Sequence, residues 1–183
     1  MDKPALRAAL RARRDAHVLG GASGFDIGQM PPGLRDRLSS SRTVAGYVAI
    51  GSEIDPTPLM DAAAALGARL ALPLTTSRKD PIRFVEWTRG DALVAGPFGL
   101  LQPASDAQAV DPDLILTPML GFDRALNRLG QGAGHYDRAF TTLPSATRIG
   151  VAWSVQEVDA LAADPWDVPL HALVTEKEWI EVQ

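Results

Sequence analysis

Between a predicted buried strand and a predicted helix, the chain reads Arg128-Leu129-Gly130-Gln131-Gly132-Ala133-Gly134-His135-Tyr136-Asp137. Glycines at alternate positions let the backbone approach a ligand closely, so that several N–H groups can point at one anion. The N-terminus of the following helix would add its partial positive charge, and Arg128 and Arg138 would add full charges. Asp137 stands where a carboxylate can hold a magnesium ion that bridges phosphates, because hard cations prefer oxygen ligands. The stretch therefore predicts a phosphate-binding loop.

The spacing of these glycines matches neither a Walker A loop nor the Rossmann fingerprint. A tight strand-to-helix connection without a ligand would contain similar glycines. The glycine pattern by itself leaves both interpretations open.

Strands and helices alternate on both sides of this loop. The predicted strands are apolar on both faces, which is typical of a mostly parallel sheet covered by helices on both sides. We therefore predict an α/β fold, a single three-layer domain over residues 1–183. The predicted strands are Thr43 to Ile50, Arg69 to Leu74, Ile82 to Trp87, Asp113 to Leu120, Arg148 to Trp153 and Leu170 to Thr175. The predicted helices are Ala5 to Leu19, Leu34 to Ser39, Pro56 to Leu66, His135 to Thr142 and a short one near Val155 to Leu161.

The first predicted helix has an apolar side and a basic side. Leu6 and Leu10 lie on the apolar side, and basic residues recur at three- and four-residue steps on the other: Lys3, Arg7, Arg11 and Arg14. From charge spacing alone, a solvated helix face is the simplest interpretation of Lys3 and Arg7. Glycines and prolines predict loops over Gly20 to Gly33 and over Leu93 to Pro103.

Composition excludes several classes of function. Hydrophobic residues make up 46% of the chain and charged residues 22%, the balance of a globular protein. The net charge of −4 argues against nucleic-acid binding, and no apolar run approaches the roughly 20 residues of a membrane helix. Cysteine is absent and the charged N-terminus lacks the apolar region of a secretory signal, so a cytoplasmic location is expected. The histidines are His17, His135 and His171, and neither zinc-ligand spacing nor a Gly-x-Ser-x-Gly elbow accompanies them.

Several motifs, in order along the chain, resemble the 5-formyltetrahydrofolate cyclo-ligase family, also called 5,10-methenyltetrahydrofolate synthetases. The resemblance extends over nearly the whole chain and depends on the joint order and spacing of the motifs. They are the pair Lys3 and Arg7, the strand Tyr47 to Ile50 followed by Glu53-Ile54-Asp55, Gly96 to Pro103, Phe122-Asp123, Asn127 to Gly130, Gly132, Gly134, Tyr136-Asp137-Arg138, Gln156, Trp166 to Leu170, and Val174-Thr175-Glu176. The resemblance implies a sheet architecture like that of sugar-phosphate isomerases and CoA transferases.

The resemblance also implies an ATP- and magnesium-dependent enzyme that closes 5-formyltetrahydrofolate into 5,10-methenyltetrahydrofolate and releases ADP and phosphate. In the implied mechanism the formyl oxygen takes the γ-phosphate, N10 of the folate attacks the same carbon, and phosphate departs. Such chemistry depends on placing two small-molecule substrates and neutralising phosphoryl charge. A monomer or a small homo-oligomer is expected.

Matched residue by residue, the resemblance implies a role for each site residue. ATP would contact Lys3, Arg7 and the loop residues Arg128, Leu129, Gly130, Gln131, Gly132, Ala133, Gly134, His135 and Tyr136. The folate would contact Val48 and Glu53, and Asp137 and Asp167 would be magnesium ligands. Without the resemblance, Asp167 would be interpreted as a turn residue before a proline, and Glu53 as a helix-start residue.

Three residues depart from the family pattern. His135 replaces the usual tyrosine, Ala133 stands where some members have lysine and others glycine, and Pro56 stands where the turn usually has threonine. These departures leave room for a non-catalytic or substrate-drifted nucleotide- or folate-binding relative on the same scaffold. An enzyme related to the isomerases or transferases of similar architecture is a further alternative, which would need Glu53 as its acid/base or acyl-accepting group.

Overall fold

The computed structural model describes residues 2–77 and 80–181, and in this part of the chain the central feature is a seven-stranded sheet with the order β11-β10-β9-β6-β1-β2-β3. Neighbours from β10 to β2 are parallel, and the antiparallel strands β3 and β11 form the two edges. In register, Val44 of β1 pairs with Leu70 on one side and Leu114 on the other. The strands are β1 (Thr43–Ala45), β2 (Arg69–Leu74), β3 (Arg83–Glu86), β6 (Leu114–Pro118), β9 (Thr147–Val151), β10 (Ala172–Val174) and β11 (Trp179–Glu181). The predicted mostly parallel α/β sheet is confirmed.

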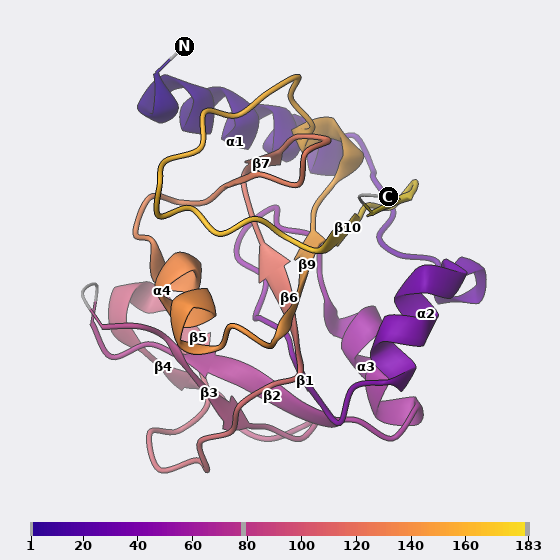
Figure 1. Cartoon of the computed structure of the whole chain (residues 1–183), viewed down its shortest axis with the longest axis vertical. Coiled ribbons are helices and arrows are strands. Elements are labelled where there is room, and N and C mark those ends of the chain that lie inside the picture. Colours follow the sequence, from indigo (N-terminus) through magenta and orange to yellow (C-terminus); the bar gives the residue numbers. More distant parts are fainter. Residues whose placement is uncertain (1, 78–79, 182–183) are drawn as a thin grey trace.

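Helices cover both faces of the sheet, as Figure 1 shows. On one face, α2 (Pro32–Ser39) and α3 (Thr57–Ala65) bury leucines such as Leu34 and Leu59 against the sheet residues Val44 and Leu114. On the other face, α4 (His135–Thr142) buries Phe140 in a second cluster with Ala45 and Ile115 of the sheet. Alternate residues of the central strands thus belong to different clusters, which is why these strands are apolar on both faces.

The first helix, α1 (Lys3–Leu19), lies across the carboxyl ends of the parallel strands, at the top of Figure 1. Its first turn is capped by Asp2, whose side chain accepts a hydrogen bond from the Ala5 N–H. Leu10 is completely buried, and the helix packs against the 3₁₀ turn η3 (Ser154–Gln156). Within the described ranges, no helix combines the length and apolar character needed to cross a membrane.

Some predicted segments were wrong in detail. The predicted loops contain the 3₁₀ turns η1 (Ile27–Gln29) and η2 (Pro97–Gly99) and the small hairpin of β4 (Val94–Ala95) and β5 (Leu101–Gln102). A second hairpin, of β7 (Gly121–Phe122) and β8 (Arg128–Leu129), carries the chain into the glycine-rich loop. The helix predicted near Val155 to Leu161 is only the 3₁₀ turn η3, and β1 ends at Ala45 rather than at Ile50. Strands of two residues are too short to show an alternating pattern.

The order of the strands places a crevice beside β1. From β1 the chain moves to β2 through α3, and it later enters β6 on the opposite side of β1. Neighbouring strands whose connections leave in opposite directions form a topological switch point, and ligands bind there beyond the carboxyl ends of the strands. The fold therefore indicates a site at the ends of β1 and β6, beneath α1.

Candidate active site

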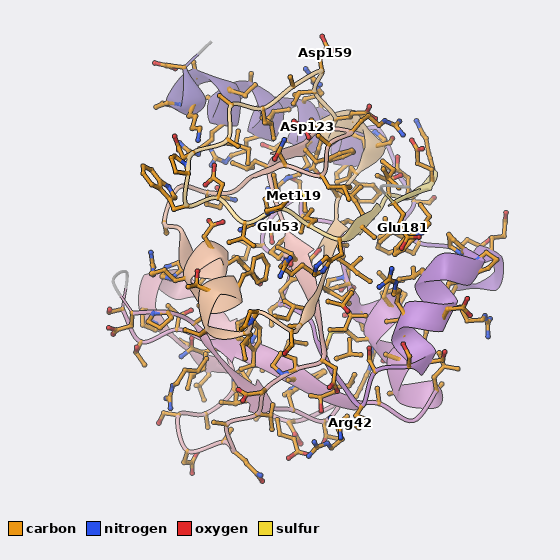
Figure 2. All side chains as sticks on the ribbon, in the orientation of Figure 1. Arg42, Glu53, Met119, Asp123, Asp159 and Glu181 are labelled. Carbon is orange, nitrogen blue, oxygen red and sulfur yellow. The ribbon has the colours of Figure 1, made fainter. Side chains whose placement is uncertain are left out.

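A cavity of about 600 Å³ opens at this switch point. Its walls come from the segments that follow β1, β2 and β6, from α1, from the stretch between β8 and α4, and from the loop before β10. Glu53 and Met119, which both line it, lie in the interior of the view in Figure 2, whereas Asp159 projects from an outer loop. The cavity brings together the residues to which the family resemblance assigns contacts: Lys3, Arg7, Val48, Glu53, Arg128, Leu129, Gly130, Gln131, Gly132, Ala133, Gly134, His135, Tyr136, Asp137 and Asp167. Arg138, which was also expected to add charge to the loop, does not line the cavity.

The glycine-rich loop takes backbone conformations that only glycine adopts easily. Gly132 has φ of 101° and Gly134 has φ of 65°, the left-handed region, where Gly134 also stands at the N-cap of α4. The loop is supported by Arg138, whose Nη1 donates to the Ala133 carbonyl oxygen at 2.9 Å, while Nη2 lies 3.2 Å from Nδ1 of His135. The loop thus turns the N-terminus of α4 toward the cavity, as an anion-binding site requires.

The basic side of α1 reaches this loop, so the interpretation of Arg7 as part of a solvated face was wrong, whereas Arg11 is exposed. Arg7 Nε donates to the Gly130 carbonyl oxygen at 2.9 Å, and Arg11 Nη2 donates to Gln131 Oε1 at 2.7 Å. Arg14, one turn further along, is only 4% exposed. Periodicity locates the polar side of a helix, but it does not distinguish bulk water from a polar cavity.

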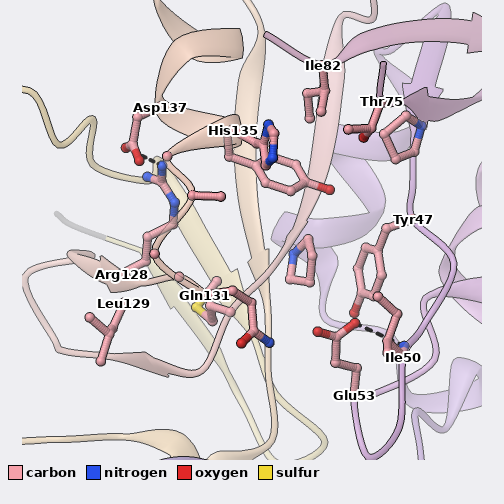
Figure 3. Close-up of a pocket in the computed structure, with 18 of the residues that line it drawn as sticks. Tyr47, Ile50, Glu53, Thr75, Ile82, Arg128, Leu129, Gln131, His135 and Asp137 are labelled. Carbon is pink, nitrogen blue, oxygen red and sulfur yellow. Dashed lines mark hydrogen bonds and ion pairs between the residues drawn. The ribbon is translucent and has the colours of Figure 1, made fainter. Parts of the chain in front are cut away.

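Arg128 and Asp137 form an ion pair between the two ends of the loop, drawn as a dashed line in Figure 3. The Arg128 guanidinium also donates to the Val168 carbonyl oxygen and lies 4.7 Å from the centre of the Phe140 ring. Burial lowers the pKa of Arg128, and the neighbouring Asp137 opposes this shift. Asp137 Oδ1 accepts a further hydrogen bond from the Val168 N–H at 3.2 Å. Asp137 is therefore held in a fixed place at the edge of the loop.

Lys3 and Asp167 meet at the mouth of the cavity. Lys3 Nζ donates to Asp164 and lies 3.5 Å from Asp167 Oδ2. Asp167 Oδ2 also accepts from the Asp164 N–H at 2.8 Å. These contacts connect the first turn of α1 to the loop before β10, so that one positive and two negative side chains stand beside the glycine-rich loop.

Glu53 and Tyr47 form the wall opposite Arg128 (Figure 3). Val48 also lines the cavity. Glu53 Oε2 accepts a hydrogen bond from the Ile50 N–H at 3.1 Å, and its side chain is only 8% exposed. Burial raises the pKa of the Glu53 carboxyl, against the lowering effects of the Ile50 N–H, Arg14 and Gln131. Burial likewise raises the pKa of the Tyr47 hydroxyl, which donates to the Ile54 carbonyl oxygen at 2.7 Å. This wall combines aromatic surface with a hydrogen-bond acceptor, as the recognition of a flat heterocycle requires.

The sequence patterns left out several residues of this neighbourhood, among them three polar ones: Tyr47, Asp164 and Arg14. Tyr47 was noted only as the start of a family-like strand, Asp164 was not singled out, and Arg14 was noted only among the basic residues of the first predicted helix. The position of Arg14, two helical turns after Arg7 on the same side, was a signal that could have placed it near the site.

Residues 1–176 match the family described as the 5-formyltetrahydrofolate cyclo-ligase family. The chain belongs to this family. It is similar to the 5-formyltetrahydrofolate cyclo-ligase of Mycolicibacterium smegmatis, with 37% identity over 152 residues that cover 77% of each chain. It is also similar to the 5-formyltetrahydrofolate cyclo-ligase of Escherichia coli K12, with 32% identity over 151 residues that cover 76% of this chain and 81% of that one.

Solved structures of 5,10-methenyltetrahydrofolate synthetases have the same fold as this cyclo-ligase family member. The NMR structure of the Aquifex aeolicus protein superposes with a TM-score of 0.73 at 29% identity, covering 99% of this chain and 93% of that one. The Mycoplasma pneumoniae protein gives a TM-score of 0.68 at 26% identity, covering 96% of this chain and 99% of that one. The family resemblance and the α/β fold expected from the sequence are both confirmed.

Proposed function

We propose that this chain is an ATP- and magnesium-dependent enzyme that converts 5-formyltetrahydrofolate into 5,10-methenyltetrahydrofolate and releases ADP and phosphate. The relatives named above carry the corresponding names. The observation that carries the proposal is the single cavity shared by the glycine-rich loop and the Glu53 wall. A reaction between two small molecules needs both in one enclosed space with the reacting atoms held close together.

The nucleotide would occupy the side of the cavity formed by α1 and the loop. Backbone N–H groups of the stretch Arg128 to Tyr136 and the N-terminus of α4 would face its phosphates, and Lys3 and Arg7 would add positive charge. Arg7 and Arg128 are held by protein acceptors, the carbonyls of Gly130 and Val168, so their side chains are positioned in advance. Such preorganised positive groups are the main requirement of phosphoryl transfer.

Asp137 and Asp167 would hold the magnesium ion. Among the described residues, no group of three or more acidic or histidine side chains gathers to form a complete protein cage for a metal. The two aspartates nevertheless fit magnesium, because this ion is usually bound by one or two carboxylates together with phosphates and water. Both carboxylates lie near Arg128, and each is fixed by a backbone N–H, from Val168 and Asp164 respectively. The ion would supply neutralisation of phosphate charge.

The folate would lie against the opposite wall. Glu53 would accept hydrogen bonds from N–H groups of the pterin, and Val48 and Tyr47 would cover its flat face. With the two substrates so placed, the formyl oxygen takes the γ-phosphoryl group and ADP is released. N10 then bonds to the formyl carbon and loses its proton, and the C–O bond breaks to release phosphate.

We further propose that residues 1–183 form one domain, that the protein acts in the cytoplasm, and that it is a monomer or a small homo-oligomer.

The direct test of the function is the absorbance of the methenyltetrahydrofolate product. Purified protein mixed with 5-formyltetrahydrofolate, magnesium and ATP should form product and ADP in equal amounts, and omission of ATP should abolish both. A folded protein that binds nucleotide but forms no product would contradict the proposal and would favour a non-catalytic or substrate-drifted relative.

A further inference from the structure

Arg14 is a buried cation on the face of α1 that covers the cavity, although it does not itself line the cavity. Its Nε donates to Ser52 Oγ at 2.9 Å, and its Nη1 lies 3.7 Å from Glu53 Oε1. Among the described residues, Nη1 finds no hydrogen-bond acceptor within normal range. A buried guanidinium with so few partners is costly, and Glu53 supplies the opposite charge that it needs.

The turn that carries Glu53 is connected to other elements on several sides. The Ser52 hydroxyl contacts both Arg14 and Asp15 of α1, and the Ser52 carbonyl oxygen accepts from Trp153 Nε1 at 2.9 Å. Within the turn, the Ile50 N–H holds the other carboxylate oxygen of Glu53. The carboxylate direction is therefore fixed between its own turn and the guanidinium of α1.

We propose that Arg14 is a positioning residue for the folate: through its contacts with Ser52 and Glu53 it holds the Glu53 carboxylate directed at the pterin. The inference rests on the proposed role of Glu53 and extends it to a residue outside the cavity wall. Arg14 acts through Glu53 and touches neither substrate, so it should affect folate binding and leave ATP binding unchanged.

The groups around Glu53 predict how the loss of Arg14 would change the pH dependence of folate binding. Arg14 faces the carboxyl from α1, Tyr47 from the end of β1 and Tyr136 from α4, while the Ile50 N–H and Gln131 are neutral donors. Burial raises the pKa of Glu53 and Arg14 opposes that shift. Removal of Arg14 should therefore raise the pKa of Glu53 further. As the pH is lowered, folate affinity should then begin to fall at a higher pH in the variant than in the unmodified protein.

The test compares Arg14→Gln and Arg14→Lys with Arg13→Gln. Arg13 lies on the same helix but is exposed and binds the Val155 and Glu157 carbonyls, away from the cavity. Equilibrium binding of 5-formyltetrahydrofolate and of magnesium-ATP, the KM of each substrate and the pH dependence of folate binding are measured. Arg14→Gln should weaken folate binding by about tenfold to a hundredfold, the range for losing a contact to a charged group, with ATP binding unchanged. Arg14→Lys should be intermediate, and Arg13→Gln should resemble the unmodified protein.

A double-variant cycle separates positioning from general damage to the fold. In a Glu53→Gln background, Arg14→Gln should cause little further loss of folate affinity, because the group through which it acts is already neutral. Equal loss of folate and ATP affinity, or an undiminished effect in that background, would overturn the proposal. If Arg14→Gln does not fold, the test uses Arg14→Lys instead. Folate binding and a pH profile that are both unaltered in Arg14→Lys would overturn the proposal. If the unmodified protein neither binds nor converts the folate, the proposed function itself fails.

Discussion

Lys3 Nζ lies 3.5 Å from Asp167 Oδ2, so the proposed phosphate-binding ammonium group and a proposed magnesium ligand contact each other across the mouth of the cavity. These residues come from opposite ends of the chain, from the first turn of α1 and from the loop before β10. Their contact joins the two ends at the place where nucleotide phosphates and magnesium would meet. A bound magnesium-nucleotide would offer each side chain a partner of opposite charge.

Replacement of Lys3 should weaken nucleotide use. We expect Lys3→Gln to raise the KM for ATP by about tenfold or more, because a charge-assisted contact to phosphate is lost. Lys3→Arg should retain part of the effect of the positive charge. Steady-state kinetics with varied ATP provide the measurement, with Lys177→Gln as control, since Lys177 is exposed and does not line the cavity. Equal KM values for the Lys3 and Lys177 variants would remove Lys3 from the nucleotide site.

The magnesium requirement should change when Asp137 is altered. Asparagine is the informative replacement, because alanine would leave the buried Arg128 without its partner at a cost of about 3–5 kcal/mol. We expect Asp137→Asn to need about tenfold or more magnesium for half-maximal activity, since a neutral amide is a weaker ligand for a hard cation. Asp159→Asn, on an exposed outer loop, is the control. The same magnesium titration curve for both variants would refute the assignment of Asp137.

Folate affinity should depend on the ionisation of Glu53. Burial raises the pKa of this carboxyl above 4.5, so protonation, which removes an acceptor for pterin N–H groups, occurs at a higher pH than in a free glutamate. As pH falls through the raised pKa, folate binding should weaken. Glu53→Gln should raise the KM for folate far more than that for ATP, and should flatten this acidic limb. A limb that persists unaltered in the variant would assign the titration to another group.

The glycine-rich loop should tolerate a methyl group at one position and not at another. At Gly132, φ is 101° and an added Cβ would lie 3.3 Å from Cζ of Arg7. Gly130 is not among the glycines with positive φ, and an added Cβ there would meet no heavy atom within 4 Å. Gly132→Ala should therefore lower the free energy of unfolding by about 1 kcal/mol or more, and Gly130→Ala should change it much less. Denaturant titration measures both, and equal losses would contradict the loop conformation.

The longer parallel strands and the helices could be predicted because they are long enough to show a pattern. β6 and α4 are examples, with continuous apolar burial in the first and an apolar stripe in the second. The strand β11 and the hairpin of β7 and β8 could not be predicted, because their pairing is decided by tertiary contacts rather than by local pattern.

The part of the candidate site that lies within continuous sequence motifs could be predicted. The stretch Arg128 to Asp137 is continuous, so its residues had to be near one another. Glu53 and Asp167 needed the family resemblance, because a single carboxylate in a turn has many explanations. Arg14 was assigned no role in the site, because helical spacing shows only that it is on the basic side, whereas the folded chain places a carboxylate and a hydroxyl opposite it. The residues that support a site are specified by packing between distant segments, which local sequence does not record.

In the proposed reaction, the cavity brings the γ-phosphate of ATP and the formyl group of the folate into direct contact. The most direct measurement uses 5-formyltetrahydrofolate that carries ¹⁸O in its formyl group, with mass analysis of the phosphate released during turnover. Direct phosphoryl transfer to the formyl oxygen predicts that the label appears in the phosphate, in the same amount as methenyltetrahydrofolate formed. Unlabelled phosphate, released while the folate is cyclised, would contradict direct phosphoryl transfer to the formyl oxygen.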